Sequence, residues 1–311
     1  MNAQTSGSIA VFGATGKQGG SVVDALLSRG AHARALVRNP ESDRAKALAD
    51  RGVELARIDI GDAASLSAAL HGVDAFFLMT TPGGQTAAAI EGETRQGIAL
   101  IDAAVAANVP HVVFSSVGGA ERDSGIPHFE SKRRVEEHLQ QSGLRATYVR
   151  PVAFMDNFTL MGPSLENGEI VLRMPLPDHV PLQLISVRDI GQISAALLLE
   201  EAKAPDGAIE IAGDERTGSQ IAAAFGEHAG LPARYEALPL EVLGDSEDAQ
   251  AMFRWFAETP AYQADVSTVK AIHPSAWDLP TWLRSSGWTL PISAPKRLSG
   301  QDGVDVAAVH S

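Results

Sequence analysis

The chain has 311 residues, of which 45% are hydrophobic and 20% charged, a composition typical of globular proteins and unlike that of disordered or collagen-like chains. It contains no cysteine, which excludes disulfides, thiolate metal sites and a cysteine nucleophile. Its formal net charge of −13 disfavours direct binding to nucleic acids. No apolar run approaches the ~18–20 residues that cross a bilayer, and residues 1–8 lack a basic signal-peptide start, so we expect a cytoplasmic protein without membrane contact.

Short apolar runs alternate with helical patterns through the first half of the chain. The runs that predict strands are 9–12, 33–37, 53–60, 73–81, 109–116 and 146–152. Because such near-continuous apolar runs are typical of strands buried on both faces, the strands are predicted to pair in parallel. The sequence therefore predicts an α/β fold with a doubly wound, parallel Rossmann sheet.

The alternation weakens after Pro151, although two apolar runs and a helical pattern between residues 184 and 212 predict that the chain returns to the sheet. The last third holds all four tryptophans, which we expect to pack the core of a smaller lobe. We therefore expect three parts: a Rossmann domain over 1–153, a C-terminal α/β lobe over 154–295 that lines a cleft and sends some elements back to the sheet, and a flexible tail over 296–311.

A glycine-rich segment joins the first predicted strand to the first predicted helix, with the spacing GxxGxxG. The first glycine permits a tight turn, the second lets the backbone approach a pyrophosphate, and the third allows the helix to pack closely on the strand. The N-terminus of the helix then offers free N–H groups to an anion. The alternative is an ordinary strand–helix turn. We predict a pyrophosphate site made of Gly13, Ala14, Thr15, Gly16, Lys17, Gln18 and Gly19.

The end of the second predicted strand bears on which dinucleotide would bind. Sites for NAD carry an Asp or Glu about 20 residues beyond the glycines. Here the strand ends in Arg38-Asn39-Pro40, and the Arg38 guanidinium suits a 2′-phosphate. Lys17 adds a second positive charge, whereas Glu41 opposes it. We therefore predict NADP(H) rather than NAD(H), and the alternative is that Arg38 is a solvated cation at the strand end.

Polar residues at the ends of the next two strands mark the expected path of the dinucleotide. Asp59 and Ile60 end the third predicted strand, where an adenine edge would rest in this architecture. Asp62, which lies closer to the following helix, is predicted to cap it. Thr80 and Thr81 end the fourth predicted strand, beside the expected dinucleotide.

Candidate catalytic residues follow the fifth predicted strand, which ends in Ser115 and Ser116. His128 and Lys132 lie four residues apart on the next helix and share one face. In short-chain dehydrogenases a serine at this strand end faces a Tyr-x-x-x-Lys helix, so the lysine is present here and a histidine replaces the tyrosine. An imidazole, with a reference pKa of ~6.5, can donate a proton. We predict Lys132 as a cofactor ligand and His128 as a candidate acid; the alternatives are a solvated helix lysine and a polar or partly buried histidine.

These motifs resemble those of the NmrA-like family, atypical members of the short-chain dehydrogenase superfamily. The resemblance covers nearly all of the chain, residues 8–290. Its most specific segments are 11–22, 37–40, 128–137, 149–157, 186–191 and 252–254. Glu41 and Ser42 stand where the family often carries basic residues, which weakens the preference for NADP.

The resemblance implies an NADP-binding Rossmann domain with a small C-terminal lobe. It implies that the glycine turn holds the pyrophosphate, that Arg38 and Asn39 hold the 2′-phosphate, and that Lys132 holds the nicotinamide ribose. It further implies that Arg95, on the long helix after the fourth strand, reaches a phosphate or the ribose. The residues that it implies at the nicotinamide end are Phe154, Met155, Asp156 and Asn157.

The missing tyrosine leaves two functions open. One is an NADP(H)-binding redox sensor or regulatory protein, which needs only different affinities in two conformations and acts through a protein partner. The other is an NAD(P)H-dependent reductase of quinones or other small, planar, conjugated carbonyls, with His128 or a bound water as the proton donor. We expect the sensor, with the reductase as the alternative, and we expect no metal site. The sequence predicts no particular oligomeric state.

Overall fold

A seven-stranded parallel sheet forms the larger part of the protein. The computed structural model describes residues 7–80, 84 and 86–290, so the expected tail at 296–311 lies outside the described residues. The strand order is β11-β6-β5-β4-β1-β2-β3, and every neighbouring pair is parallel. The strands are β1 (Ser8–Phe12), β2 (His32–Val37), β3 (Glu54–Arg57), β4 (Ala75–Met79), β5 (Val112–Ser115), β6 (Ala146–Pro151) and β11 (Ala208–Ile211).

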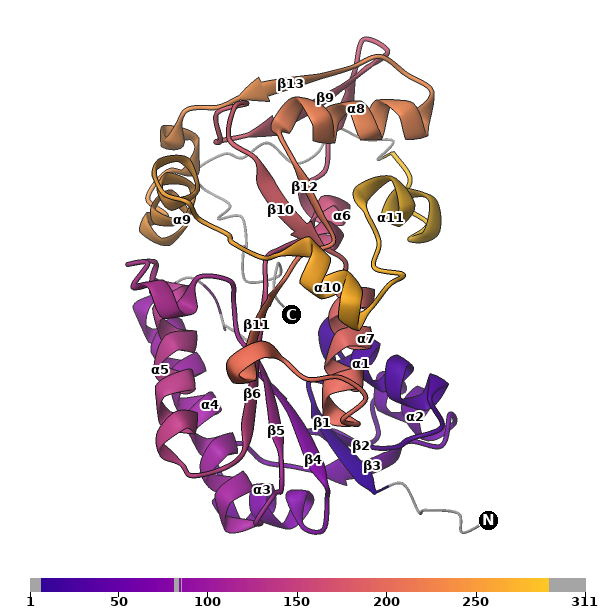
Figure 1. Ribbon diagram of the computed structural model, residues 1–311, viewed down its shortest axis with the longest axis vertical. Helices are drawn as coiled ribbons and strands as arrows, with labels where there is room; N and C mark the ends of the chain where they lie inside the picture. The colour runs from indigo at the N-terminus through magenta and orange to yellow at the C-terminus, as the bar shows by residue number, and fades with distance from the viewer. Residues whose placement is uncertain (1–6, 81–83, 85, 291–311) are drawn as a thin grey trace.

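Helices cover both faces of this sheet (Figure 1). One face carries α3 (Ala63–Leu70), α4 (Ala87–Ala106) and α5 (Pro127–Gln141), and the other carries α1 (Lys17–Ser28), α2 (Asp43–Ala49) and α7 (Val187–Leu198). The strand order reverses between β1 and β4, and ligands of doubly wound sheets bind at such a point, beyond the carboxyl ends of the strands. The predicted Rossmann sheet is therefore confirmed.

Four of the predicted strands, those that became β3, β4, β5 and β6, are shorter in the structure. β3 ends at Arg57, so the prediction that Asp59 and Ile60 end this strand is wrong. The Asp59 carboxylate accepts the Gly61 N–H at 2.9 Å, and the Asp59 N–H donates to Ser65 Oγ at 3.1 Å, so these groups form a local turn instead of pairing with β2. β4 ends at Met79, and Thr81 lies outside the described residues.

The cap that the sequence predicts for α3 is present. The Asp62 side chain accepts the N–H groups of Ala64 and Ser65, as an aspartate at a helix N-cap does. The helix begins at Ala63, directly after its cap, and ends at Leu70, which agrees with the predicted range of 63–70.

Helix α7 belongs to the second half of the chain but packs directly on α1. A Cβ atom added to Gly191 would lie 2.5 Å from the backbone of Ser21, so only a glycine allows this close approach. The Ser21 hydroxyl donates to the Arg188 carbonyl at 3.4 Å across the same contact. Strand β11 also lies beyond residue 153, so this part of the chain adds a strand and a helix to the Rossmann domain. The domain boundary predicted near 153 stays a prediction.

The remaining residues form a smaller lobe with two three-stranded sheets (Figure 1). One sheet contains β7 (Ala153–Phe154), β10 (Leu182–Ile185) and β12 (Asp214–Arg216). The other contains β8 (Ser164–Glu166), β9 (Glu169–Met174) and β13 (Ala233–Ala237), and α8 (Gly218–Ala229) packs on it. Further helices of this lobe are α6 (Phe158–Met161), α9 (Glu247–Glu258), α10 (Val266–Ile272) and α11 (Leu279–Ser285).

The hairpin of β8 and β9 lies in a segment rich in proline and glycine, where the sequence analysis predicts no strand. Asn167 and Gly168 join the two strands, with φ of +51° and +82°. A two-residue turn with positive φ at both positions is the type that Asn-Gly favours in hairpins. This dipeptide was the signal for the hairpin.

Three of the four tryptophans belong to the core of the smaller lobe, as expected. Trp255, Trp282 and Trp288 are buried in one aromatic cluster. Trp277 is half-buried, and the Arg188 guanidinium lies over its ring at 4.5 Å from the ring centre.

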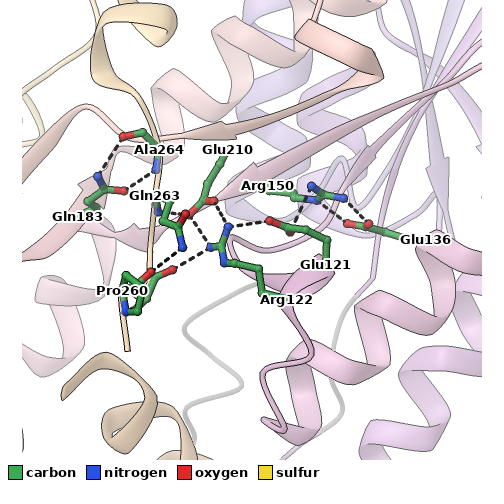
Figure 2. Close-up of polar contacts among 10 residues, drawn as sticks. Glu121, Arg122, Glu136, Arg150, Gln183, Glu210, Pro260, Gln263 and Ala264 are labelled. Carbon is green, nitrogen blue, oxygen red and sulfur yellow. Dashed lines mark hydrogen bonds and ion pairs between the residues drawn. The ribbon is translucent and has the colours of Figure 1, made fainter. Parts of the chain in front are cut away.

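An ionic cluster joins the two lobes (Figure 2). Arg122, at the end of a short 3-10 turn that follows β5, lies 2.9 Å from Glu210 of β11. Its guanidinium also donates to the Ala261 carbonyl at 2.9 Å, and Glu210 accepts the Gln263 N–H at 2.8 Å. Both partners on the smaller lobe lie in the segment that follows α9. The segment after α9 is therefore bound to β11, the edge strand of the main sheet.

The cluster extends on both sides. Towards the main sheet, Arg150 of β6 pairs with Glu136 of α5 at 2.7 Å and with Glu121 at 3.2 Å. Towards the smaller lobe, the Gln183 side chain of β10 exchanges two hydrogen bonds with the Ala264 backbone, each 3.0 Å long. One chain of polar contacts therefore runs from α5 to β10 through the segment after α9.

Over the ranges described above, no helix combines the length and the apolar character that crossing a bilayer requires.

Replacing Gly191 with alanine tests the packing of α7 on α1. The added methyl group meets backbone, so we expect the free energy of unfolding to fall by about 1–3 kcal/mol in urea denaturation. Gly92 of α4 is the matched control, because the nearest atom to its added Cβ is the end of the Arg95 side chain at 3.8 Å. We expect Gly92→Ala to raise stability by about 0.5–1 kcal/mol. Equal effects at both positions would contradict the packing.

Candidate functional site

The glycine turn has the geometry that its spacing predicts. Gly13 follows β1 with a φ of +74°, which favours glycine, and the Gly16 N–H donates to the Gly13 carbonyl at 2.9 Å. A Cβ added to Gly19 would lie 2.4 Å from the Gly13 carbonyl. The first turn of α1 therefore packs directly on the backbone that leaves β1.

The N-terminus of α1 is suited to an anion. Its N-cap, Gly16, has no side chain to accept the first N–H groups, and the first turn contains no acidic residue. Gln18 is 5% exposed, and its Oε1 has no hydrogen-bond partner within the described ranges. This turn combines uncapped amides, the positive end of a helix and a buried polar side chain. Together these features fit a pyrophosphate.

Two arginines lie beside this turn. Phe12 pairs with Leu36 across β1 and β2, so Arg38 leaves β2 alongside the turn, where its side chain is exposed. It makes no hydrogen bond or ion pair to any other residue that the structure describes. Arg44 of α2 donates to the Thr15 carbonyl at 3.5 Å, which brings a second guanidinium to the turn. The sequence analysis missed Arg44.

The Asn39 side chain has a local contact. Its Oδ1 accepts the Glu41 N–H at 3.0 Å in the turn before α2, while Glu41 itself pairs with Lys46. Glu41 therefore has a positive partner, which reduces the repulsion that it would exert on an anion near Arg38.

Lys132 forms a buried ion pair. Its ammonium lies 2.8 Å from the Glu93 carboxylate and 2.9 Å from Thr80 Oγ1, and Glu93 also accepts the Ser131 hydroxyl at 2.8 Å. Glu93 is 1% exposed. Burial raises its pKa, but Lys132 and the neighbouring hydroxyls outweigh this effect, so the pKa of Glu93 lies below its ordinary value. The structure thus joins Thr80 and Lys132, two predicted site residues, through an acid that the sequence analysis missed.

Arg95 lies apart from this pair. It is exposed on α4 and pairs with Glu91 one turn earlier, at 3.8 Å. Glu93 and Arg95 are two positions apart on a helix, so they point to opposite sides of α4. The structure does not bring Arg95 together with Lys132.

The segment from Phe154 to Asn157 lies where β7 passes into a short 3-10 turn. Phe154 and Met155 are buried. The Asp156 carboxylate accepts the N–H of Val187, the first residue of α7, at 2.8 Å. Burial raises the pKa of Asp156 above its ordinary value, although the Val187 N–H and the Lys17 ammonium act in the opposite direction. The segment is therefore electrostatically coupled to the glycine turn.

Ser115 ends β5 and Ser116 follows it, and both side chains are buried. Neither hydroxyl has a hydrogen-bond partner among the residues that the structure describes. Because carboxyl ends of parallel strands meet at one edge of a sheet, these hydroxyls lie at the same edge as the glycine turn.

His128 is held by an acid from the smaller lobe. Its Nδ1 lies 2.7 Å from Asp248 Oδ2, and its backbone N–H donates to Asp248 Oδ1 at 3.0 Å. Both side chains are buried. Asp248 is in the first turn of α9, 120 residues away in the sequence, and the sequence analysis missed it.

No group of three or more His, Asp or Glu suited to a metal ion occurs within ranges 7–80, 84 and 86–290.

A doubly wound parallel sheet with a glycine turn at its switch point defines a Rossmann-fold protein. A sequence model of the NmrA-like family matches residues 5–282. The chain therefore belongs to the NmrA-like family.

Proteins similar to this chain in sequence or in fold include reductases and a regulator. An NAD(P)H azoreductase from Xenophilus azovorans is 33% identical over 235 residues, which are 75% of this chain and 78% of that protein. The structure of triphenylmethane reductase from Citrobacter sp., complexed with NADP(H), has a TM-score of 0.77 at 23% identity and covers 89% of this chain and 99% of that one. NmrA, a negative transcriptional regulator solved in complex with NADP, has a TM-score of 0.74 at 20% identity and covers 91% of this chain and 95% of its own.

Replacing Lys132 with methionine tests the buried ion pair. Glu93 then keeps its burial without its countercharge, so we expect a loss of about 3–5 kcal/mol at neutral pH in urea denaturation. Lys132→Met/Glu93→Gln should recover most of this loss, and Lys203→Met, at an exposed lysine, should change little.

The pH dependence of the same variant has a defined sign. Without Lys132, burial raises the pKa of Glu93 above its value in the unfolded chain, so the folded state binds the proton more tightly. The loss in Lys132→Met should therefore shrink as the pH falls. In the wild type the lowered pKa of Glu93 contributes stability at neutral pH, which is lost as the pH falls through the pKa of the folded state. A pH-independent loss would contradict the pair.

Proposed function

We propose that the protein is an NADP(H)-dependent oxidoreductase that reduces a small, planar, conjugated substrate. One observation carries this proposal: a histidine held by a buried aspartate follows β5 at the same sheet edge as the glycine turn. The first feature is suited to proton transfer and the second to a dinucleotide. When bound, the reduced nicotinamide supplies a hydride, and the protein must supply the proton.

The roles of the residues in cofactor binding follow from their surroundings. The amides at the start of α1 bind the pyrophosphate, and Arg38 and Arg44 bind the 2′-phosphate of NADP. Phe154 to Asn157 line the nicotinamide end. Lys132 has two of its three N–H donors directed at Glu93 and Thr80, so in our proposal it binds the ribose with the donor that remains.

The substrate class is inferred from the apolar side chains near this segment. Leu160 is 59% and Met161 37% exposed on α6, directly after the nicotinamide segment. Met252 and Phe253 are half-buried on α9, the helix that carries Asp248. Such surfaces suit flat apolar molecules such as quinones or azo compounds. The azoreductase relative supports this substrate class.

A binding protein without turnover is the second candidate. It is favoured by the absence of a tyrosine four residues before Lys132 and by the ion pair that holds Lys132. The NADP complex of the regulator NmrA supports this candidate too. Such a protein would signal through a partner whose affinity depends on the bound cofactor.

Turnover separates the two candidates. We expect NADPH oxidation with a panel of quinones and azo dyes, at a kcat above about 1 s⁻¹ with the best substrate. His128→Ala should lower kcat about 10²-fold or more if His128 donates the proton. His138→Ala is the control, because it removes an acid-paired histidine further along the same helix. Absence of turnover with every substrate would leave the binding protein, and an unchanged kcat in His128→Ala would remove the role of His128.

The two arginines can be tested by calorimetric titration with NADPH and NADH. A charge-assisted hydrogen bond contributes about 1.5–3 kcal/mol, so Arg38→Ala and Arg44→Ala should each weaken NADPH binding tenfold or more and leave NADH binding unchanged. Lys203→Ala, at an exposed lysine outside this site, controls for the loss of a surface positive charge. Equal losses for both cofactors would overturn the 2′-phosphate assignment.

A further inference from the structure

We infer that Asp248 is a positioning residue for His128. In this inference, Asp248 fixes the imidazole with its proton on Nδ1, so that Nε2 is the nitrogen that exchanges a proton with the substrate. The inference rests on the proposed function, in which His128 is the proton donor, and it adds the residue that prepares the ring for this task.

The Asp248 carboxylate contacts two donors of the same residue. Its Oδ1 accepts the His128 backbone N–H at 3.0 Å and lies 2.9 Å from Nδ1, while Oδ2 lies 2.7 Å from Nδ1. Backbone and ring are therefore held at once, which fixes the orientation of the side chain.

The backbone contact replaces a missing cap. The N-cap of α5, Ile126, has no side chain that accepts the first N–H groups of the helix, and Pro127 has no N–H. His128 is the next residue, and its N–H is satisfied by Asp248 from α9. Asp248 thus acts as an N-cap from another element, at the helix end where a negative charge is favourable.

The ring contact determines the tautomer. A carboxylate accepts hydrogen bonds and donates none, so the neutral imidazole must carry its proton on Nδ1. In the protonated ring both nitrogens carry protons, and Nδ1–H still donates to the Asp248 carboxylate. The proton that leaves is then the one on Nε2.

The proton and electron balance of the step is simple. The substrate accepts a hydride from NADPH, which becomes NADP⁺. It also accepts one proton from Nε2 of protonated His128. The ring returns to its neutral form with the proton on Nδ1 and recovers the second proton from water.

Aromatic contacts hold α9 near the start of α5. The Phe129 ring, next to His128 in sequence, packs edge-on against Trp255 of α9 at 5.5 Å between ring centres. Trp255 also lies against Gly119, where an added Cβ would meet its ring at 2.7 Å, and the Arg122 guanidinium lies 5.9 Å from its ring centre.

The segment after α9 is fixed as well, because Arg122 and Glu210 bind Ala261 and Gln263 (Figure 2). Both ends of α9 are therefore attached to the main sheet and its helices. Asp248 reaches His128 only when α9 is docked in this way, so the smaller lobe completes the proton-donating pair.

Asp248→Asn separates positioning from folding. The asparagine oxygen still accepts the backbone N–H, but its NH₂ group now faces Nδ1 and favours the tautomer with the proton on Nε2. Asp248→Glu keeps the charge as a conservative variant. Glu247→Gln is the matched control, because it removes a neighbouring negative charge that is exposed in the same first helical turn.

The direct readout is the ¹⁵N spectrum of the histidine side chains, recorded over a pH series up to the range in which the His128 ring is neutral, with the His128 signals identified by their loss in His128→Gln. We expect Nδ1 to carry the proton in the wild type and Nε2 to carry it in Asp248→Asn. In steady-state kinetics, Asp248→Asn should lower kcat about 10²-fold with KM and NADPH affinity unchanged. Asp248→Glu should recover part of kcat, and Glu247→Gln should behave as wild type.

The outcomes distinguish the two proposals. A wild-type ring protonated on Nε2, or an unchanged kcat in Asp248→Asn, overturns the inference and leaves the reductase intact. If the wild type has no turnover with any substrate, the proposed function fails, and the tautomer measurement alone then supports or overturns the pairing of Asp248 with His128.

Discussion

The close packing of Gly19 on the Gly13 carbonyl is the constraint on which the rest of the site depends. It brings the first turn of α1 directly against the end of β1, at the point where the strand order of the sheet reverses. The first N–H groups of α1 therefore lie at this edge of the sheet, and no side chain caps them. The arginines after β2, the hydroxyls after β5 and the histidine of α5 all follow strands that end at this edge.

Acids from other elements hold Lys132 and His128, the two side chains to which we assign roles in the proposed function. Glu93 of α4 holds Lys132, and Asp248 of α9 holds His128, each inside the protein. A buried ion pair is costly to break because it leaves one charge without a partner, so it fixes its members in one geometry. The Glu93–Lys132 pair connects α4 with α5, and the contact between Asp248 and His128 connects α5 with the smaller lobe. In our proposal, cofactor binding at the sheet edge and docking of α9 are therefore linked through His128.

The sequence predicted the Rossmann fold and the geometry of the glycine turn, but not the acids that contact Lys132 and His128. The Rossmann sheet and the glycine turn were readable because they rest on local periodicity and spacing. Asp248 and Glu93 were not, because their partners lie 120 and 39 residues away and nothing in a local pattern pairs them. Arg44 was missed because it is on α2, beyond the strand end where a 2′-phosphate ligand was sought. The β8–β9 hairpin was also missed, although Asn167-Gly168 is a local signal for such a turn.

The most direct test of the account is amide hydrogen exchange of the whole protein with and without NADPH. We predict that the cofactor slows exchange most strongly at the glycine turn and the first turn of α1, residues 13–19, and next at the loop from Arg38 to Arg44. Unchanged exchange at residues 13–19 under saturating NADPH would contradict the anion site at the start of α1, and with it the proposed function.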